Sequence, residues 1–385
     1  MYFFPSLPFI QKFLLLVIIF SNNISNVLGQ TVNIANYIQT SNNLSTLRQL
    51  LSYPGLIDLF TLLNSPSTGV EKLTLFAPTN DAFISSGLDL TNGAFVSNLL
   101  KYHTVPDQEI LSKDLTPILV INTLLNDSSL VRLPNGGQVL YITKSFQGDI
   151  TINNGNSNTP AKVIQVDIIC TNGVIHLIDS VIVPPLSLID TANNLGLTQF
   201  LNAFTNANLL SNVNTSIGMT IFVPTNDAFN RPNILSMGST ELNSLLKLHV
   251  INGTSIYEIK DGLNIESSSP GKNLHFIVKN DGLNNTIYVN NGKVEKSDVL
   301  LQNGVMYIID NVILPLENNV DDKKNSFNSD YIANHTRDKK LIIGTVLGGI
   351  CGGIVISLFS CMLYKWYRAQ KNTKSITTSS SNNKT

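Results

Sequence analysis

Cysteine, histidine and charge are all scarce in this sequence. Three cysteines among 385 residues cannot hold together a disulfide-rich scaffold. Charged residues make up only 13%, and 25 Lys and Arg nearly balance 26 Asp and Glu, so the chain has no strong field to recruit nucleic acid. The hydrophobic content of 43% excludes a disordered polyelectrolyte. The length allows two or three ordinary domains.

Motifs for catalysis or metal binding are missing as well. No Gly-x-Ser-x-Gly elbow, phosphate-binding loop or dinucleotide fingerprint occurs. The five histidines contain no His-x-x-x-His pair, and no cysteine has a suitable neighbour for a zinc site. We therefore expect no enzymatic activity, no cofactor and no metal. Cys170 is interpreted as a buried free thiol, with an intermolecular disulfide as the alternative.

Two apolar segments lie near the ends of the chain. Residues 13–20 are too short to span a bilayer and precede small residues before Gln30, which is typical of a cleaved signal peptide. Residues 341–364 carry no charge and have basic and aromatic flanks, which predicts a membrane-spanning helix. We expect a single-pass plasma-membrane protein with its N-terminus outside the cell. Its segments are a signal peptide (1–29), a polar stalk (318–340), a transmembrane helix (341–364) and a short disordered cytoplasmic tail (365–385).

The middle of the chain repeats itself. Thr74–Phe83 recurs as Thr220–Phe229 with eight of ten residues identical, and Asn172–Pro184 recurs as Asn303–Pro315. The first signature is displaced by 146 residues and the second by 131, so the first copy holds about 15 extra residues between its signatures. We predict two tandem domains, over 30–185 and 186–317.

Each signature predicts a local structure. Residues 74–77 are apolar and β-branched, which predicts a buried strand that ends at Pro78. The next residues, Thr79-Asn80-Asp81, favour the start of a helix because their side-chain oxygens accept hydrogen bonds from unpaired helix amides. Asn172-Gly173 predicts a turn that leads into a strand pair over 174–183.

Between the signatures the periodicity changes. Residues 95–102 and 242–249 have helical spacing, whereas 163–166 and 275–278 alternate as strands do. Strands and helices are segregated along the chain, so the expected class is α+β.

These signatures resemble those of the fasciclin (FAS1) domain family, and they occur twice. The family's central Tyr-His pair is matched by Tyr102-His103, whereas the second copy has Leu248-His249. Its second signature places a histidine at His176, which Tyr307 replaces in the second copy. The resemblance extends over about residues 31–316. It implies a wedge-shaped β-sandwich of about seven strands with flanking helices, and a role in adhesion or matrix binding without enzymatic activity.

The resemblance also guides the choice of site residues. Family members often bind ligands through loops near the Tyr-His pair, so Tyr102 and His103 are the candidate partner-binding residues. The long region 122–160, rich in Asn, Gly and Ser, is interpreted as an elaborated loop. The remaining motif residues are expected to be structural: Pro78, Thr79, Asn80, Asp81, His176, Asp179, Pro224, Thr225, Asn226, Asp227, His249 and Asp310.

Six Asn-x-Ser/Thr sequences lie in the part of the chain predicted to be outside the cell. They are Asn43, Asn126, Asn214, Asn252, Asn284 and Asn334. We expect most of the exposed ones to carry glycans, which makes the protein a glycoprotein.

Two functions from different classes remain open. The first is a cell-surface adhesion glycoprotein that binds a matrix or wall component, or a surface protein, through its tandem domains. Homophilic contact, or pairing through Gly344, Gly348 and Gly352 of the apolar segment, would raise its valency. The alternative is a non-enzymatic receptor or carrier for a small apolar ligand, which would need a cavity. Nucleic acid is not an expected partner.

Overall fold

The structure, a computed structural model, describes residues 32–66, 72–153, 159–229, 234, 237–280 and 285–315. The predicted signal peptide, stalk, transmembrane helix and cytoplasmic tail lie outside these residues. Within the described ranges no helix is long and apolar enough to cross a membrane.

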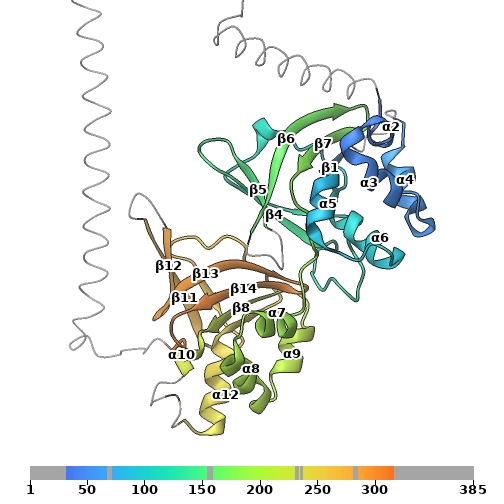
Figure 1. Ribbon diagram of the computed structural model, residues 1–385. Coiled ribbons are helices and arrows are strands. Elements are labelled where there is room, and N and C mark those ends of the chain that lie inside the picture. The colour runs from blue at the N-terminus through green and yellow to red at the C-terminus, as the bar shows by residue number, and fades with distance from the viewer. Residues whose placement is uncertain are drawn as a thin grey trace, which may run out of the picture. The chain divides into compact units, whose positions relative to one another are not determined.

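The first copy consists of one seven-stranded sheet with helices gathered on one side of it (Figure 1). Its helices are α2 (Ile34–Thr40), η1 (Asn42–Leu44), α3 (Ser45–Leu50), η2 (Pro54–Leu56), α4 (Ile57–Leu63), α5 (Asn80–Ser86), α6 (Gly93–Tyr102) and η3 (Ser112–Asp114). Its strands are β1 (Leu73–Pro78), β2 (Thr104–Val105), β3 (Ile118–Asn122), β4 (Val139–Lys144), β5 (Ile150–Ile152), β6 (Ala161–Cys170) and β7 (Gly173–Ile178). The strand order is β2-β1-β7-β6-β5-β4-β3, and only β1 and β7 pair in parallel.

The second copy repeats this plan in the order β9-β8-β14-β13-β12-β11-β10. Its described helices are α7 (Leu188–Asn194), α8 (Thr198–Asn206), α9 (Leu210–Thr215), α10 (Asn226–Phe229) and α12 (Ser239–Leu248). Its strands are β8 (Met219–Pro224), β9 (Val250–Asn252), β10 (Asn264–Glu266), β11 (Asn273–Asn280), β12 (Asn285–Val289), β13 (Gly292–Leu301) and β14 (Gly304–Ile309). The predicted α+β class, with about seven strands and flanking helices per copy, is confirmed.

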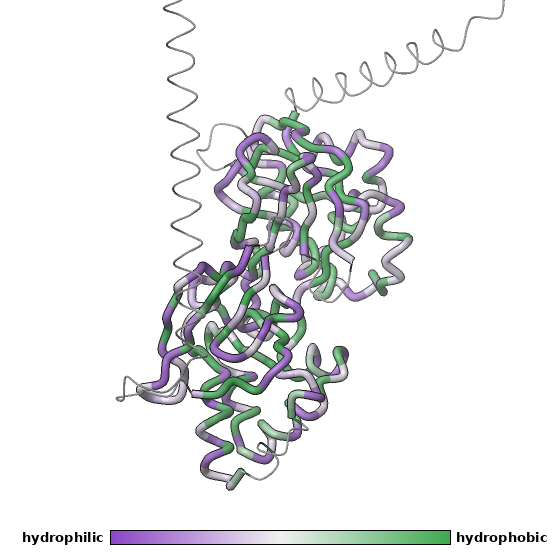
Figure 2. Tube along the Cα trace, turned by 90° about the vertical axis from the view of Figure 1, so that its left-hand side faces the viewer, coloured by the Kyte–Doolittle hydropathy of each residue, from purple (hydrophilic) through white to green (hydrophobic). Residues whose placement is uncertain are grey.

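Each sheet buries both of its faces along the central strands. In β1, Leu75 packs into the core beneath the helices, and its neighbour Phe76 packs into a second core on the opposite face. In β8, Ile221 and its neighbour Phe222 likewise pack into two separate cores on opposite faces of the sheet. The central strands β1, β7, β8 and β14 are therefore buried along their whole length. Elsewhere, Figure 2 shows hydrophobic and hydrophilic stretches intermixed along the chain.

The parallel strand pair explains the glycine of the second signature. Gly173 has a φ of 151°, and a Cβ there would overlap the carbonyl oxygen of Leu73. Gly304 has a φ of 152°, and a Cβ there would overlap the carbonyl oxygen of Met219. Only glycine allows these strands to approach so closely.

Two predicted elements differ from the structure. The strand pair predicted over 174–183 is a single strand, β7, whose antiparallel partner β6 precedes the Asn172-Gly173 turn. The long region predicted as an elaborated loop, 122–160, instead contains the hairpin β4–β5, which completes the sheet. The two strands are short, and the loops around them are rich in Asn, Gly and Ser. The composition of the whole region therefore indicated a loop.

The two copies contact each other through this same region. The backbone of Arg132 donates to the carbonyl of Gln302 and accepts from Gly218, each over 2.8 Å. The side chain of Gln138 donates to the carbonyl of Leu301 over 3.2 Å. The extra length of the first copy therefore contributes to an interface with the second.

Candidate functional site

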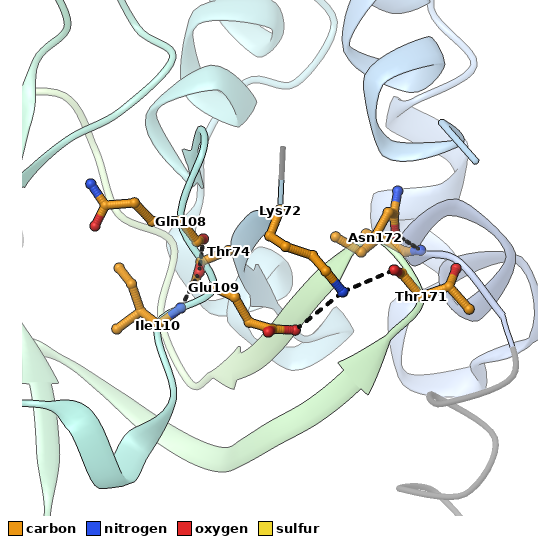
Figure 3. Close-up of polar contacts among 8 residues, drawn as sticks. Lys72, Thr74, Gln108, Glu109, Ile110, Thr171 and Asn172 are labelled. Atoms are coloured by element: carbon orange, nitrogen blue, oxygen red, sulfur yellow. Dashed lines mark hydrogen bonds and ion pairs between the residues drawn. The ribbon is translucent and has the colours of Figure 1, made fainter. Parts of the chain in front are cut away.

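A polar network common to both copies surrounds the first signature strand. The Thr74 hydroxyl donates to the carbonyl of Gln108 over 2.7 Å and accepts from the amide of Ile110 over 2.8 Å (Figure 3). In the second copy Thr220 makes the same two contacts, with Thr254 and Ile256, over 2.9 and 2.8 Å. This threonine therefore fixes the loop that follows the short edge strand.

The neighbouring residue Asn172, also drawn in Figure 3, holds helices to the sheet. Asn172 accepts from the amide of Ile34 and donates to the carbonyl of Leu63, each over 2.9 Å. Lys72 donates to the carbonyl of Thr171 and lies 3.8 Å from the carboxylate of Glu109. That ion pair is partly exposed to water, so it adds little stability.

Thr79 and Asn80 have separate structural roles. Thr79 caps helix α5, since its side chain accepts from the amide of Ala82 over 3.2 Å. Asn80 accepts from the amide of Thr46 and donates to the carbonyl of Asn42, which fastens α5 to the preceding helices. Asn226 repeats this bridge in the second copy, with Gln199 and Gly196.

The other first-signature residues lie at equivalent places in the two copies. Asp81 and Asp227 are exposed in the first turns of α5 and α10, where a negative charge is favourable. Pro78 and Pro224 end β1 and β8, and the amide of Thr225 donates to the carbonyl of Ile309.

His103 and His249 are fully buried and make equivalent hydrogen bonds. Nδ1 of His103 donates to the carbonyl of Leu99 over 2.7 Å, and Nε2 accepts from the amide of Ile182 over 3.0 Å. Nδ1 of His249 bonds Leu245 and its Nε2 accepts from Ile313. Burial lowers the pKa of both imidazoles to about 4, so both rings are neutral at physiological pH. Each histidine links the end of a helix, α6 or α12, to the segment that follows β7 or β14. Neither ring is placed to act as a general base.

His176 and Tyr307 provide the same contact with different chemistry. Nε2 of His176 bonds the carbonyl of Ile110 over 2.8 Å, and the ring stacks on Phe76. The Tyr307 hydroxyl donates to the carbonyl of Ile256 over 2.7 Å, and its ring stacks on Phe222. The replacement of His by Tyr therefore preserves the structural contact. Burial lowers the pKa of His176.

The aspartates of the second signature bind backbone amides of the neighbouring strand. Asp179 accepts from the amide of Lys162, and Asp310 accepts from the amide of Lys293, each over 2.8 Å. These carboxylates therefore help to set the register of β6 and β13. Among the described residues, no cluster of His, Cys, Asp and Glu has the arrangement of a metal site.

Tyr102 and His103 do not form the surface expected of partner-binding residues. Both side chains are fully buried, and the Tyr102 hydroxyl donates to the carbonyl of Val139 over 2.9 Å. Tyr102 lies on the buried face of α6 and His103 follows it as the C-cap residue, so neither side chain is exposed to a partner in this conformation. Cys170 is also buried, and burial raises the pKa of its thiol to about 12.

The glycan candidates differ in accessibility. Asn43, Asn126 and Asn252 are exposed, and Asn214 is half-buried. The Asn214 side-chain oxygen accepts from the amide of Ile189, and its carbonyl accepts from the Arg132 side chain of the first copy. Asn284 and Asn334 lie outside the described residues.

The junction between the copies contains titratable groups that the sequence did not single out. Tyr141 packs with Val139 against Leu300 of the second copy, and Asn153 donates to the carbonyl of Asp298 over 2.8 Å. The Asp298 carboxylate also lies 3.3 Å from the Tyr307 hydroxyl. Burial raises the pKa of Asp298 and, with the nearby Asp298 charge, that of Tyr141. Only the extra length of the first copy signalled this junction in the sequence.

A second feature missed by the sequence is a group of four exposed apolar side chains on β3, on β6 and in the turn between β4 and β5. It consists of Ile118, Phe146, Ile164 and Val166, and we call it the turn-end patch. Phe146 stands fully exposed in the turn between β4 and β5, and Ile164 is 58% exposed on β6. Side chains of this kind suit contact with another macromolecule.

Comparisons with known proteins agree with the doubled fold. The Fasciclin domain family model matches residues 42–184 and 195–315, more than half of the chain. The chain therefore belongs to the fasciclin domain family, as its signatures predicted.

Individual relatives are similar over both copies. The chain is 30% identical over 292 residues to the fasciclin-like arabinogalactan protein elcF of Phaeosphaeria nodorum, covering 73% of this chain and 88% of that protein. It is 28% identical over 277 residues to human periostin, covering 64% of this chain and 29% of periostin. A solved FAS1 domain pair from the insect cell adhesion molecule Fasciclin I shares 20% identity, with a TM-score of 0.31, over 70% of this chain and 96% of that one.

Proposed function

We propose that this chain is a non-enzymatic cell-surface adhesion glycoprotein. Its two fasciclin domains bind an extracellular partner, which is a matrix or wall component or a protein on another surface. A signal peptide exports the chain, the apolar segment 341–364 anchors it with its N-terminus outside, and the cytoplasmic tail is short.

The observation that supports this proposal best is the family match over both copies. The motif residues that recur in the two copies are engaged in capping, in bridging helices or in fixing strand register. None of the contacts described for them resembles a nucleophile held by a base or a pair of acid and base groups. Binding is therefore assigned to the surfaces that differ between the copies.

The carrier function has no comparable support. A concavity on the first copy is lined by polar side chains, which suit water or a polar ligand better than an apolar one. Its lining residues are Gln39, Ser45, Thr46, Arg48, Gln49 and Ser52.

The test uses the full chain expressed in suspension cells. Antibody binding to intact cells and a mobility shift after glycan removal first check that the described domains are outside and glycosylated. Attachment to other such cells and to wells coated with extracellular extract is then compared with vector cells. We expect attachment in at least one arm. A chain that is displayed outside yet attaches to neither would contradict the proposal.

A further inference from the structure

Ile118 of the turn-end patch lies on the sheet face that also contacts the second copy. Along β3 and β4, Val120 and Tyr141 are paired residues, and both pack at the junction with the second copy. Ile118, two residues before Val120, pairs with Thr143, two residues after Tyr141. Because side chains two apart share one face of a sheet, Ile118 and Thr143 continue the face that the second copy covers.

The patch is held in a rigid frame. The hydroxyls of Thr143 and Thr151 bond each other over 2.7 Å across β4 and β5. In the turn that carries Phe146, the Ser145 amide donates to Asp149 over 2.9 Å and the Gly148 amide donates to Ser145 over 3.0 Å. A partner therefore meets preorganised apolar side chains, which reduces the entropy lost on binding.

The charges beside the patch are self-complementary. Asp149 and Lys162 are both exposed, at the turn and on β6. Within the part of the chain that the structure describes, neither forms an ion pair with another residue. In a two-fold symmetric contact, Lys162 of one copy meets Asp149 of the other and the same pair forms twice.

The second fasciclin domain lacks this surface. The amides of Lys162 and Lys293 bond the equivalent residues Asp179 and Asp310, so these two lysines occupy the same place in the two domains. Two residues further on, the first domain has Ile164 and the second has Glu295. The equivalent position is therefore charged in the second domain. No Asn-x-Ser/Thr sequence lies on β4, β5, β6 or the turn between β4 and β5, so glycans are attached elsewhere.

From these observations we infer that the turn-end patch, with Asp149 and Lys162, binds a second copy of this chain in a two-fold homophilic contact. This inference rests on the proposed adhesive function and names the partner of one surface. Its apolar side chains supply affinity, and the charge pair sets the orientation of the two copies. Many such contacts between two cells add up, so each one needs only weak affinity.

The test uses suspension cells that display the full chain at equal surface levels. Ile164→Glu introduces the residue that the second domain already has in this register, and Phe146→Asn shortens the exposed turn residue. Both are expected to abolish cell aggregation. Ile84→Glu, on exposed helix α5 of the same domain, is the matched control and should aggregate like the wild type.

Charge reversal supplies a second, independent arm. Cells with Asp149→Lys, and separately cells with Lys162→Asp, should fail to aggregate with themselves but should aggregate when mixed, because both charge pairs are restored. Normal aggregation by Ile164→Glu and Phe146→Asn cells would overturn the inference, as would no recovery in the mixture. Wild-type cells that bind extract-coated wells but not each other would overturn it too, and would leave the proposed function intact.

Discussion

At the scale of single residues, the side chains that recur in both domains build the fold. His103 and His249 show this most clearly, because each is fully buried and accepts from one backbone amide while it bonds one carbonyl. A histidine in a family motif is easily mistaken for a base or a ligand. Here its value lies in its two ring nitrogens, which satisfy two backbone groups in the core.

Replacing one of these histidines should therefore destabilise the protein. His103→Ala leaves the amide of Ile182 and the carbonyl of Leu99 unpaired and opens a cavity, at a cost of about 2–4 kcal/mol. His275→Ala, at a half-buried position on β11, should change stability by less than about 1 kcal/mol. Denaturant unfolding monitored by fluorescence measures both. Equal effects would contradict the account.

The same histidines predict how stability depends on pH. Their pKa is about 4 in the folded chain and about 6.5 in the unfolded chain. Between these values the unfolded chain binds more protons, so the free energy of unfolding should fall as pH drops from about 6.5 to about 4. The loss should be on the order of 2–3 kcal/mol per histidine. His103→Gln should show a shallower pH slope than the wild type; an unchanged slope would exclude this cause.

At the scale of elements, the tightest steric constraint is the close approach of the two parallel signature strands, β1 and β7. Gly173→Ala would force a Cβ onto the carbonyl oxygen of Leu73, so it should cost about 3 kcal/mol or more or prevent folding of the first domain. Gly55→Ala is the control, since no atom lies near its added Cβ, and should stay within about 1 kcal/mol. Thermal unfolding compares them. A stable Gly173→Ala variant would refute the proposed constraint.

Sequence patterns predicted these elements well where the interactions that form them join residues close together in the sequence. Thr79 was recognisable as a helix cap, Pro78 as a strand end and Asn172-Gly173 as a turn, because each acts on residues within a few positions. The burial of Tyr102 and the hairpin within 122–160 depend on partners far along the chain, such as Val139. A pattern of nearby residues contains no information about such contacts. The turn-end patch was missed for the same reason.

At the scale of the whole molecule, the two domains are joined by specific contacts and differ on their outer faces. Tyr141 and Val139 of the first domain pack against Leu300 of the second. In the second domain the corresponding strand, β11, places His275 and Asn273 where β4 has Tyr141 and Val139. These polar residues suit a face that contacts water.

The junction should make the two domains unfold together. Tyr141 faces the second domain rather than its own core, so Tyr141→Ser should weaken the junction while it leaves the first domain folded. Calorimetry is expected to show one transition for the wild type and two for this variant. Tyr288→Ser, at a half-buried position on β12 of the second domain, is the control and should retain one transition. Two transitions in the wild type would contradict the coupling.

The central claim is that this chain attaches cells to an extracellular partner through its fasciclin domains. The most direct test is the force needed to detach single cells that display the full chain, from each other and from a surface coated with extracellular extract. The account predicts a detachment force above that of vector cells in at least one of these settings, and its loss after the domains are removed from the cell surface by protease. Equal forces for displaying and vector cells in both settings would contradict it.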